Sequence, residues 1–163
     1  MRILIMLIIL SVIANTAIGQ RKDVSNYKLF RTSFDKNFKF PAKLKTANAS
    51  IFAVILLTFK KDGKIDKLLF SDGAPPELIS EIERIKEKVN FKAIYDNISI
   101  NSPNIKVLIP IQVDALRMAG GGNPIPQRDL DKMYLFQGKP ILGECFFYPS
   151  INLKYYYNNY EKQ

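Results

Sequence analysis

Apolar residues fill both faces of one predicted strand in the middle of the chain. The segment from Ser50 to Lys60 is rich in β-branched and aromatic residues and too short to span a membrane, which is typical of a strand. Successive side chains of a strand point to opposite faces. One row contains Ile51, Ala53, Ile55, Leu57 and Phe59, and the other contains Phe52, Val54 and Leu56. We therefore expect a separate cover on each face of this strand.

A tight turn, a second strand and a helix follow. Asp62-Gly63 supplies two residues that tolerate positive φ in a hairpin, and Ile65 to Phe70 is predicted as the returning strand. After a break at Ser71 to Pro76, the segment Glu77 to Val89 is predicted to be a helix. Its apolar residues recur at helical spacing, at Leu78, Ile82, Ile85 and Val89. This helix is expected to cover one face of the first strand.

A third strand is predicted from Ile105 to Val113, after Phe91 to Asp96 and a polar loop. Pro110 has no N–H to donate to a strand ladder. We therefore expect this strand to lie at a sheet edge or to be hydrogen-bonded on one side at that residue.

The first residues, MRILIMLIILSVIANTAIGQ, are typical of a signal peptide. Arg2 supplies the positive start, Ile3 to Ala14 form an apolar stretch, and Ala17 and Gly19 are small residues at the positions that precede a cleavage site. We expect cleavage between Gly19 and Gln20 and a periplasmic or secreted protein. An uncleaved membrane anchor is the alternative.

The net charge of +9 is unevenly distributed. The segment from Gln20 to Lys45 carries eight basic residues against Asp23 and Asp35, whereas Thr46 to Asp114 carries nine of each sign. Residues 20–39 are therefore interpreted as a basic N-terminal arm. It has too many aromatic residues for a free linker but too little periodicity for a predicted element. Export argues against nucleic acid, so the fitting partners are an anionic membrane surface, an acidic polymer or an acidic protein. A solubilising lead-in is the plainest alternative.

Residues 115–163 form an aromatic-rich C-terminal extension. Gly120 to Gly122 is interpreted as a hinge. The aromatic residues beyond it are Tyr134, Phe136, Phe146, Phe147, Tyr148, Tyr155, Tyr156, Tyr157 and Tyr160. Because a disordered tail is normally poor in such residues, we predict that part of the extension, chiefly Met133 to Tyr148, packs on the uncovered face of the sheet. A second copy of the chain in a homodimer is the alternative cover.

Candidate chemistry is sparse. The chain has no histidine and one cysteine, Cys145. A single cysteine excludes an intramolecular disulfide, and Cys145 is expected to be a small buried apolar residue. Asp62, Asp66 and Asp72 suggest calcium, but Asp62 is explained by the turn and Asp66 by the exposed face of a strand. We predict no catalytic residues, no metal, no cofactor and a protein that is not an enzyme.

The order of these segments resembles a known family. Phe40-Pro41, the long apolar strand, KDGKIDKLLF, PPELISEIERIKEKVNFKAI and KVLIPIQV together resemble the C-terminal domain of the TonB energy-transducer family. The resemblance covers about residues 40–114. It implies a small α+β domain with an antiparallel sheet, made of a β-hairpin, one packed helix and a β-strand, to which the C-terminal extension is added. The tryptophan that this family often has near Val89 to Ala93 is absent, as is the usual proline after Lys92.

The resemblance also implies a binding mode. Transducers of this family pair their last strand with an extended peptide of an outer-membrane receptor in the periplasm of Gram-negative cells. Transferred to this chain, the partner-binding residues are Ile105, Lys106, Val107, Leu108, Ile109, Ile111 and Val113.

Two departures point to a relative without the transducing apparatus. Only residues 20–39, which lack proline, separate the signal segment from Phe40, whereas transducers have a long proline-rich linker. The aromatic extension also follows the strand that should be free, so it is a candidate to occupy the docking edge. We expect an exported, non-enzymatic envelope protein that binds a protein partner by strand pairing or through its aromatic tail. The alternative is a structural or surface-associated protein whose basic arm binds acidic envelope polymer or lipid.

Overall fold

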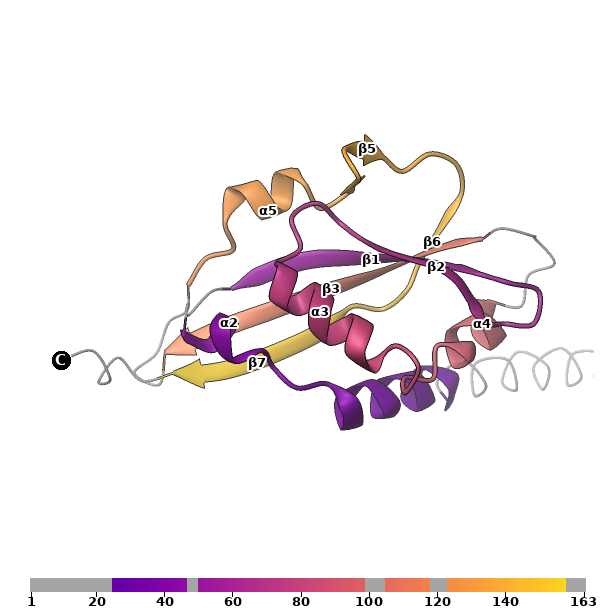
Figure 1. The fold of residues 1–163 in the computed structure, drawn as a ribbon, viewed down its shortest axis with the longest axis horizontal. Coiled ribbons are helices and arrows are strands. Elements are labelled where there is room, and N and C mark those ends of the chain that lie inside the picture. The colour runs from indigo at the N-terminus through magenta and orange to yellow at the C-terminus, as the bar shows by residue number, and fades with distance from the viewer. Residues whose placement is uncertain (1–24, 47–49, 99–104, 118–122, 158–163) are drawn as a thin grey trace, which may run out of the picture.

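A five-stranded sheet lies between two layers of unequal size (Figure 1). The computed structural model describes residues 25–46, 50–98, 105–117 and 123–157. The described helices are residues 25–37, α2 (Ala42–Thr46), α3 (Pro76–Ile85), α4 (Lys92–Ile98) and α5 (Gln127–Asp131). The described strands are β1 (Ile51–Phe59), β2 (Ile65–Phe70), β3 (Lys106–Arg117), β4 (Leu135–Phe136), β5 (Lys139–Pro140), β6 (Cys145–Phe147) and β7 (Ile151–Tyr157). The predicted signal peptide and the hinge at Gly120 to Gly122 lie outside the described residues.

The sheet is mostly antiparallel, and its last two strands come from the C-terminal extension. Its order is β2-β1-β3, with β6 and β7 both beside the free side of β3. The pairs β1–β2 and β1–β3 are antiparallel, whereas β6 and β7 run parallel to β3. The prediction of a mixed α+β fold is confirmed. An aromatic-rich extension that supplies parallel strands was not predicted.

Pro110 lies inside the sheet rather than at its edge, and the surrounding pairing explains how the sheet accommodates it. Val54, opposite Pro110 in β1, directs its N–H and C=O to Ser71. On the other side of β3, β6 pairs as far as Leu108 and β7 pairs from Ile111. Pro110 therefore lies between the end of the β6 pairing and the start of the β7 pairing. At this position the sheet needs no backbone N–H from β3, so proline is tolerated.

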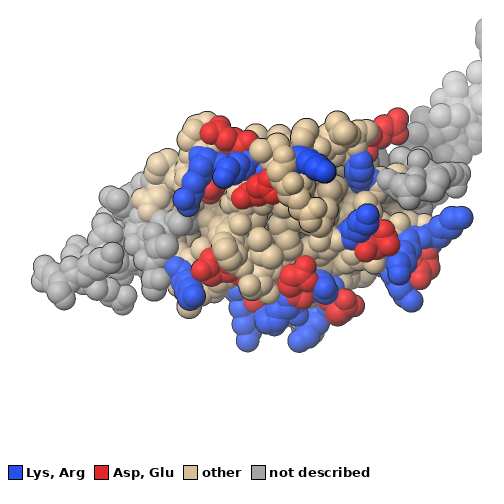
Figure 2. All heavy atoms as spheres, turned by 45° about the horizontal axis from the view of Figure 1, so that its top comes forward, with Lys and Arg blue, Asp and Glu red and all other residues tan. Residues whose placement is uncertain are grey.

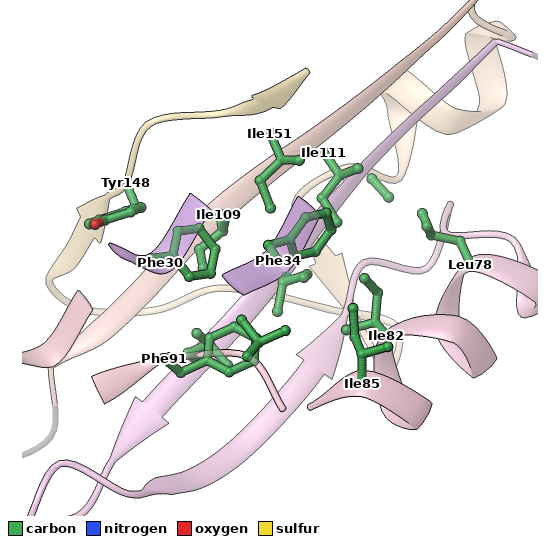
Figure 3. Close-up of a cluster of buried hydrophobic side chains, with 14 of the residues drawn as sticks. Phe30, Phe34, Leu78, Ile82, Ile85, Phe91, Ile109, Ile111, Tyr148 and Ile151 are labelled. Carbon is green, nitrogen blue, oxygen red and sulfur yellow. The ribbon is translucent and has the colours of Figure 1, made fainter. Parts of the chain in front are cut away.

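The two apolar faces of β1 are each covered, as predicted. Ile51, Ala53, Ile55 and Leu57 belong to a large core beneath the helices, part of which is drawn in Figure 3. Val54 and Leu56 belong to a smaller core on the opposite face, where Phe136 is buried and Met133 and Ile141 pack against it. The prediction that the extension covers this face is confirmed for these residues. Tyr148 is an exception because it packs in the large core, with its ring 5.7 Å from that of Phe30.

Residues 25–37 form a helix of the large core, where the sequence predicted a basic arm without an element. Phe30 and Phe34 are fully buried, and they point toward the same cluster as Ile82 and Ile109 in Figure 3. Residues four apart lie on one face of a helix, so this segment is amphipathic. The contact partners of that apolar face come from distant parts of the chain, which is why the segment alone did not reveal it.

The helix predicted from Glu77 to Val89 is shorter in the structure. It ends at Ile85, whose carbonyl accepts hydrogen bonds from the N–H groups of Lys88 and Val89. The segment from Phe91 to Asp96, which was not predicted as an element, is largely the helix α4. Charged residues of both signs are interspersed over the face shown in Figure 2. In the part of the chain that the structure describes, no helix has the length and apolar composition that crossing a membrane requires.

The hairpin turn differs from the predicted pair of positive φ angles. Gly63 has a φ of 80°, but Asp62 does not share this conformation. Gly63 N–H donates to the carbonyl of Lys60, and Lys60 N–H donates to that of Lys64, while the strand register shifts between Thr58 and Phe59. This is a longer hairpin loop with a bulge, in which glycine occupies the left-handed position.

Candidate partner-binding edge of the sheet

The seven residues predicted to bind a partner all lie on β3 or directly before it, and most of them are core residues. Val107, Ile109, Ile111 and Val113 are fully buried in the large core, and Leu108 is buried in the smaller one. Ile105 and Lys106 are partly exposed. The buried side chains of β3 mainly hold the sheet to its covers on both faces.

Both edges of β3 are paired within the chain. One edge pairs with β1 from Lys106 to Val113. The other edge pairs with β6 from Lys106 to Leu108 and with β7 from Ile111 to Arg117. The extension thus occupies the edge on which the resemblance placed a receptor peptide. Partner binding by β3 itself stays a prediction, and it requires β6 and β7 to be displaced.

The next strand outward, β6, presents an apolar edge. Among the described residues, β6 pairs with β3 alone. Phe146 lies in register with Val107 and Phe147 with Leu108, and these two β3 residues face different cores. Because neighbours in register share a face of the sheet, the two phenylalanine side chains flank the β6 edge on opposite faces. They are 39% and 60% exposed.

Further apolar groups extend this surface on the side of the smaller core. The ring of Tyr134 lies edge-on to that of Phe147, with 6.4 Å between centroids, and Tyr134 is 42% exposed. Leu142 is 74% exposed, and its carbonyl accepts a hydrogen bond from Lys106 Nζ. We call Tyr134, Phe146, Phe147 and Leu142, together with the outer edge of β6, the aromatic edge.

Natural proteins usually protect a sheet edge with charges, proline or a covering element. None of the three residues of β6 is charged, and the nearest such devices are Glu144 before the strand and Pro149 after it. Cys145, which was expected to be buried, is partly exposed and packs against the smaller core. Among the described residues, no strand pairs with the outer side of β6.

The outer side of β7 differs from that of β6 because helices contact it. Arg31 Nη2 donates to the carbonyl of Asn152 at 3.1 Å, and the hydroxyl of Tyr155 donates to the carbonyl of Leu44 at 3.2 Å. Tyr156 is nevertheless 61% exposed. The helix over residues 25–37 and α2 thus flank β7, whereas no such hydrogen bond joins these helices to β6 among the described residues.

The three aspartates considered for calcium serve separate local roles. Asp62 accepts a hydrogen bond from the backbone N–H of Lys64, which lowers the pKa of its carboxyl. Asp66 lies 3.5 Å from the hydroxyl of Thr58, and Asp72 accepts from the N–H groups of Gln137 and Gly138. Among the described residues, no three His, Cys, Asp or Glu side chains gather in a way that would hold a metal ion.

Sequence reasoning placed Phe146 and Phe147 in a segment that packs on the sheet and did not identify them as an exposed edge. The signal in the sequence is the run Cys145 to Phe147, which is apolar without alternation and lies between Glu144 and Pro149. Such a run does not reveal which of its sides pairs with another strand. That side was decided by the parallel pairing with β3.

No protein-family model, no curated protein and no solved structure matches the chain. The site is therefore interpreted from its own geometry.

Proposed function

We propose that this protein is an exported, non-enzymatic binding module of the cell envelope that takes up an extended segment of a protein partner along the aromatic edge. One observation carries the proposal: β6 combines an outer edge without a paired strand among the described residues with exposed phenylalanine side chains on both of its faces. Strand addition needs both parts. Main-chain hydrogen bonds supply affinity, and side-chain contacts on alternate faces supply selectivity.

The proposed mode shifts the site by one strand from the one that the TonB resemblance implies. In the proposed TonB C-terminal-like domain, β2-β1-β3 supplies the sheet, and β6 and β7 fill the edge of β3 in the same chain. An incoming segment then pairs with β6 in place of β3. The residues that we assign to the contact are Phe146, Phe147 and Tyr134.

Export supports a partner in the envelope. The proposed mature chain begins at Gln20, after cleavage of the signal segment. Mass spectrometry of the protein from the periplasmic fraction of its own cells tests this assignment. An intact Met1 in that fraction contradicts the cleavage.

The first test of the binding mode is a backbone NMR titration with synthetic extended peptides of alternating apolar and polar residues. The matched control peptides carry proline at alternate positions, which removes the N–H groups that pair with a strand edge. We expect saturable shifts of the amides of Cys145 to Phe147 with the first set and none with the second. Shifts of equal size with both sets contradict strand pairing.

A pair of equally exposed aromatic residues tests the side-chain contact. Phe147→Ser is expected to weaken peptide binding about tenfold or more, because burying a phenylalanine side chain stabilises by roughly 1.5 to 3 kcal/mol. Tyr156→Ser is the control, since Tyr156 is 61% exposed and Phe147 is 60% exposed. Equal losses in the two variants, or no loss in either, contradict the assignment to the aromatic edge.

A further inference from the structure

A second surface, on the helical layer, has a different chemistry. We propose that the outward face of the helix over residues 25–37, with Lys39 two residues after its end, docks the protein on a lipid bilayer that contains anionic headgroups. We call Lys28, Leu29, Thr32, Lys36 and Lys39 the basic face; all five side chains are exposed. This surface is separate from the aromatic edge, so the proposal does not rest on strand addition.

The charge excess of the described chain is concentrated beside this face. Residues 25–46 contain six basic side chains and one acidic side chain, Asp35, whereas residues 50–98 contain eight of each sign. Asp35 is already paired with Arg31, whose Nε lies 2.9 Å from Asp35 Oδ2. Among the described residues, none of Lys28, Lys36 and Lys39 takes part in an ion pair. The charges of Lys28 and Lys36 therefore remain available to an anionic surface, while the charge of Lys39 acts in part on the carboxyl of Glu81.

The acidic residues of the neighbouring α3 neutralise little of this charge because most have basic partners of their own. Glu81 is paired with Arg84 at 2.6 Å, and Glu83 is paired with Lys86 at 2.7 Å. In Figure 2, Lys and Arg side chains lie along the lower border of the molecule with Asp and Glu side chains among them. Residues 25–46 and 76–88 together carry nine basic and five acidic side chains, so this layer keeps a net positive charge.

Leu29 selects a bilayer over a soluble acidic polymer. Leu29 follows Lys28 in the helix and is 52% exposed. Phe30 and Phe34, on the opposite side of the same helix, are buried in the core. An amphipathic helix on a membrane combines lysines that reach the headgroups with an apolar side chain that enters the acyl boundary. A dissolved polyanion offers no acyl region to Leu29.

The sequence places this face close to an apolar segment. Ile3 to Ala14 precede the helix, and the intervening residues 15–24 include the basic pair Arg21 and Lys22. Even fully extended, this stretch reaches at most about 35 Å, at 3.3 to 3.6 Å per residue. Before the proposed cleavage, while the apolar segment is in the membrane, the basic face is therefore within reach of the headgroups.

The test is co-sedimentation of the proposed mature chain, Gln20 to Gln163, with phosphatidylcholine vesicles, with and without phosphatidylglycerol as the anionic lipid. Each lysine near an anionic surface strengthens binding about fivefold. The triple variant Lys28→Gln, Lys36→Gln, Lys39→Gln is therefore expected to lose affinity for the anionic vesicles on the order of 100-fold. Raising the salt from about 0.1 M to 1 M shortens the screening length from about 10 to 3 Å and is expected to release the unsubstituted chain.

The matched control changes the net charge equally on other surfaces. Lys67→Gln, Lys132→Gln, Lys139→Gln removes three exposed lysines from β2, from the loop after α5 and from β5. This variant is expected to bind within a few-fold of the unsubstituted chain, and thermal unfolding of both triple variants verifies that each is folded. Equal losses in the two variants overturn the basic face. Equal binding of all chains to neutral vesicles shows that anionic headgroups are not needed and also overturns it.

A soluble polyanion separates a bilayer from charge alone. Leu29→Ala is expected to weaken binding to the anionic vesicles several-fold and to leave binding to poly-glutamate in solution unchanged. If poly-glutamate binds the unsubstituted chain as tightly as the vesicles do, and Leu29→Ala changes neither, bilayer docking is overturned.

Discussion

Two aromatic side chains fix the helix over residues 25–37 to the rest of the protein. Phe30 and Phe34 have no exposed surface, and the ring of Phe30 lies 5.6 Å from that of Phe91 and 5.7 Å from that of Tyr148. Phe34 stacks on Phe38 at 5.1 Å. A segment that looks like a charged arm in the sequence therefore supplies central core residues.

Phe34→Ala is expected to lower the free energy of unfolding by about 3 to 5 kcal/mol, because it removes buried contacts and leaves a cavity. Urea unfolding measures the change. Leu29→Ala on the same helix is the control, since Leu29 is 52% exposed and its truncation is expected to change stability by less than about 0.5 kcal/mol. A small effect of Phe34→Ala would mean that the helix is not packed on the sheet as described.

Glu81 ties the end of the same helix to α3. Its Oε1 accepts hydrogen bonds from the backbone N–H of Lys39 and from Arg84 Nη2, and Arg84 Nη2 also donates to the carbonyl of Asn37. The bonds from Arg84, together with the N–H of Lys39, hold the pKa of the Glu81 carboxyl below its ordinary value of 4.5. A lowered pKa in the folded state means that the carboxylate stabilises the fold above about pH 4.5 and that this contribution is lost as the pH falls through the folded pKa.

Glu81→Gln is expected to destabilise the protein by roughly 1 kcal/mol at pH 7, because Arg84 is partly exposed and solvent screens the pair. The difference from the unsubstituted protein should begin to shrink as the pH falls below about 4.5, where Glu81 of the unfolded chain becomes protonated, and should close below the lowered pKa of the folded state. Urea unfolding at several pH values measures it. Glu83→Gln, which disrupts the more exposed pair with Lys86, should show a smaller difference. A gap that stays constant to low pH contradicts the electrostatic origin.

At the scale of elements, the carboxylate of Asp72 holds the β4–β5 hairpin, which covers the smaller core. The two-residue turn between β4 and β5 has positive φ at both positions, 55° at Gln137 and 75° at Gly138. Both N–H groups donate to Asp72 at 2.8 Å, and Asp72 N–H donates to the carbonyl of Leu135 at 2.8 Å. The loop after β2 thus fixes a hairpin that is distant in the sequence, and with it the buried Phe136.

Asp72→Ala is expected to cost about 1 to 2 kcal/mol, because two amide hydrogen bonds to a carboxylate are lost at an exposed site. Hydrogen exchange of Gln137 and Gly138 should accelerate, while exchange in β1 and β3 stays slow. Asp66→Ala is the control, since its contact with Thr58 is long at 3.5 Å. Unchanged protection of the turn in Asp72→Ala would show that the hairpin is held by the smaller core alone.

At the scale of the whole molecule, the extension completes the sheet. Strands β6 and β7 follow β3 in parallel, and Tyr148, Ile151 and Tyr155 from this segment are buried in the large core. The same segment that closes β3 also presents the aromatic edge. Completion of the fold and the proposed binding surface thus belong to one stretch of chain.

A chain that ends at Gly143 is expected to unfold or self-associate, because it exposes the edge of β3 and the contact surfaces of Ile151 and Tyr155. Size-exclusion chromatography and circular dichroism measure this. A peptide of residues 144–163 should restore a folded complex, and the same peptide with Ile151→Lys should not. A truncated chain that stays monomeric and as stable as the full chain contradicts this role of the extension.

The sequence alone determined the features that depend on local pattern. The two apolar rows of β1 required a cover on each face, and both covers are present. The β1–β2 hairpin, the start of α3 and the position of β3 also followed from alternation, helical spacing and turn residues. Each of these signals lies within a few consecutive residues, so no distant partner was needed to recognise it.

Tertiary structure decided the features that depend on distant partners. The helix over residues 25–37 and α4 contribute Phe30, Phe34 and Ile94 to the core. The apolar faces of these short segments can be recognised only when the sheet against which they pack is known. The parallel pairing of β6 and β7 with β3 joins residues about forty positions apart, and no local pattern encodes such a register. The candidate site follows the same division. The sequence indicated that the extension would pack on the domain, but the pairing of β3 decided which edge was filled and which aromatic side chains remained exposed.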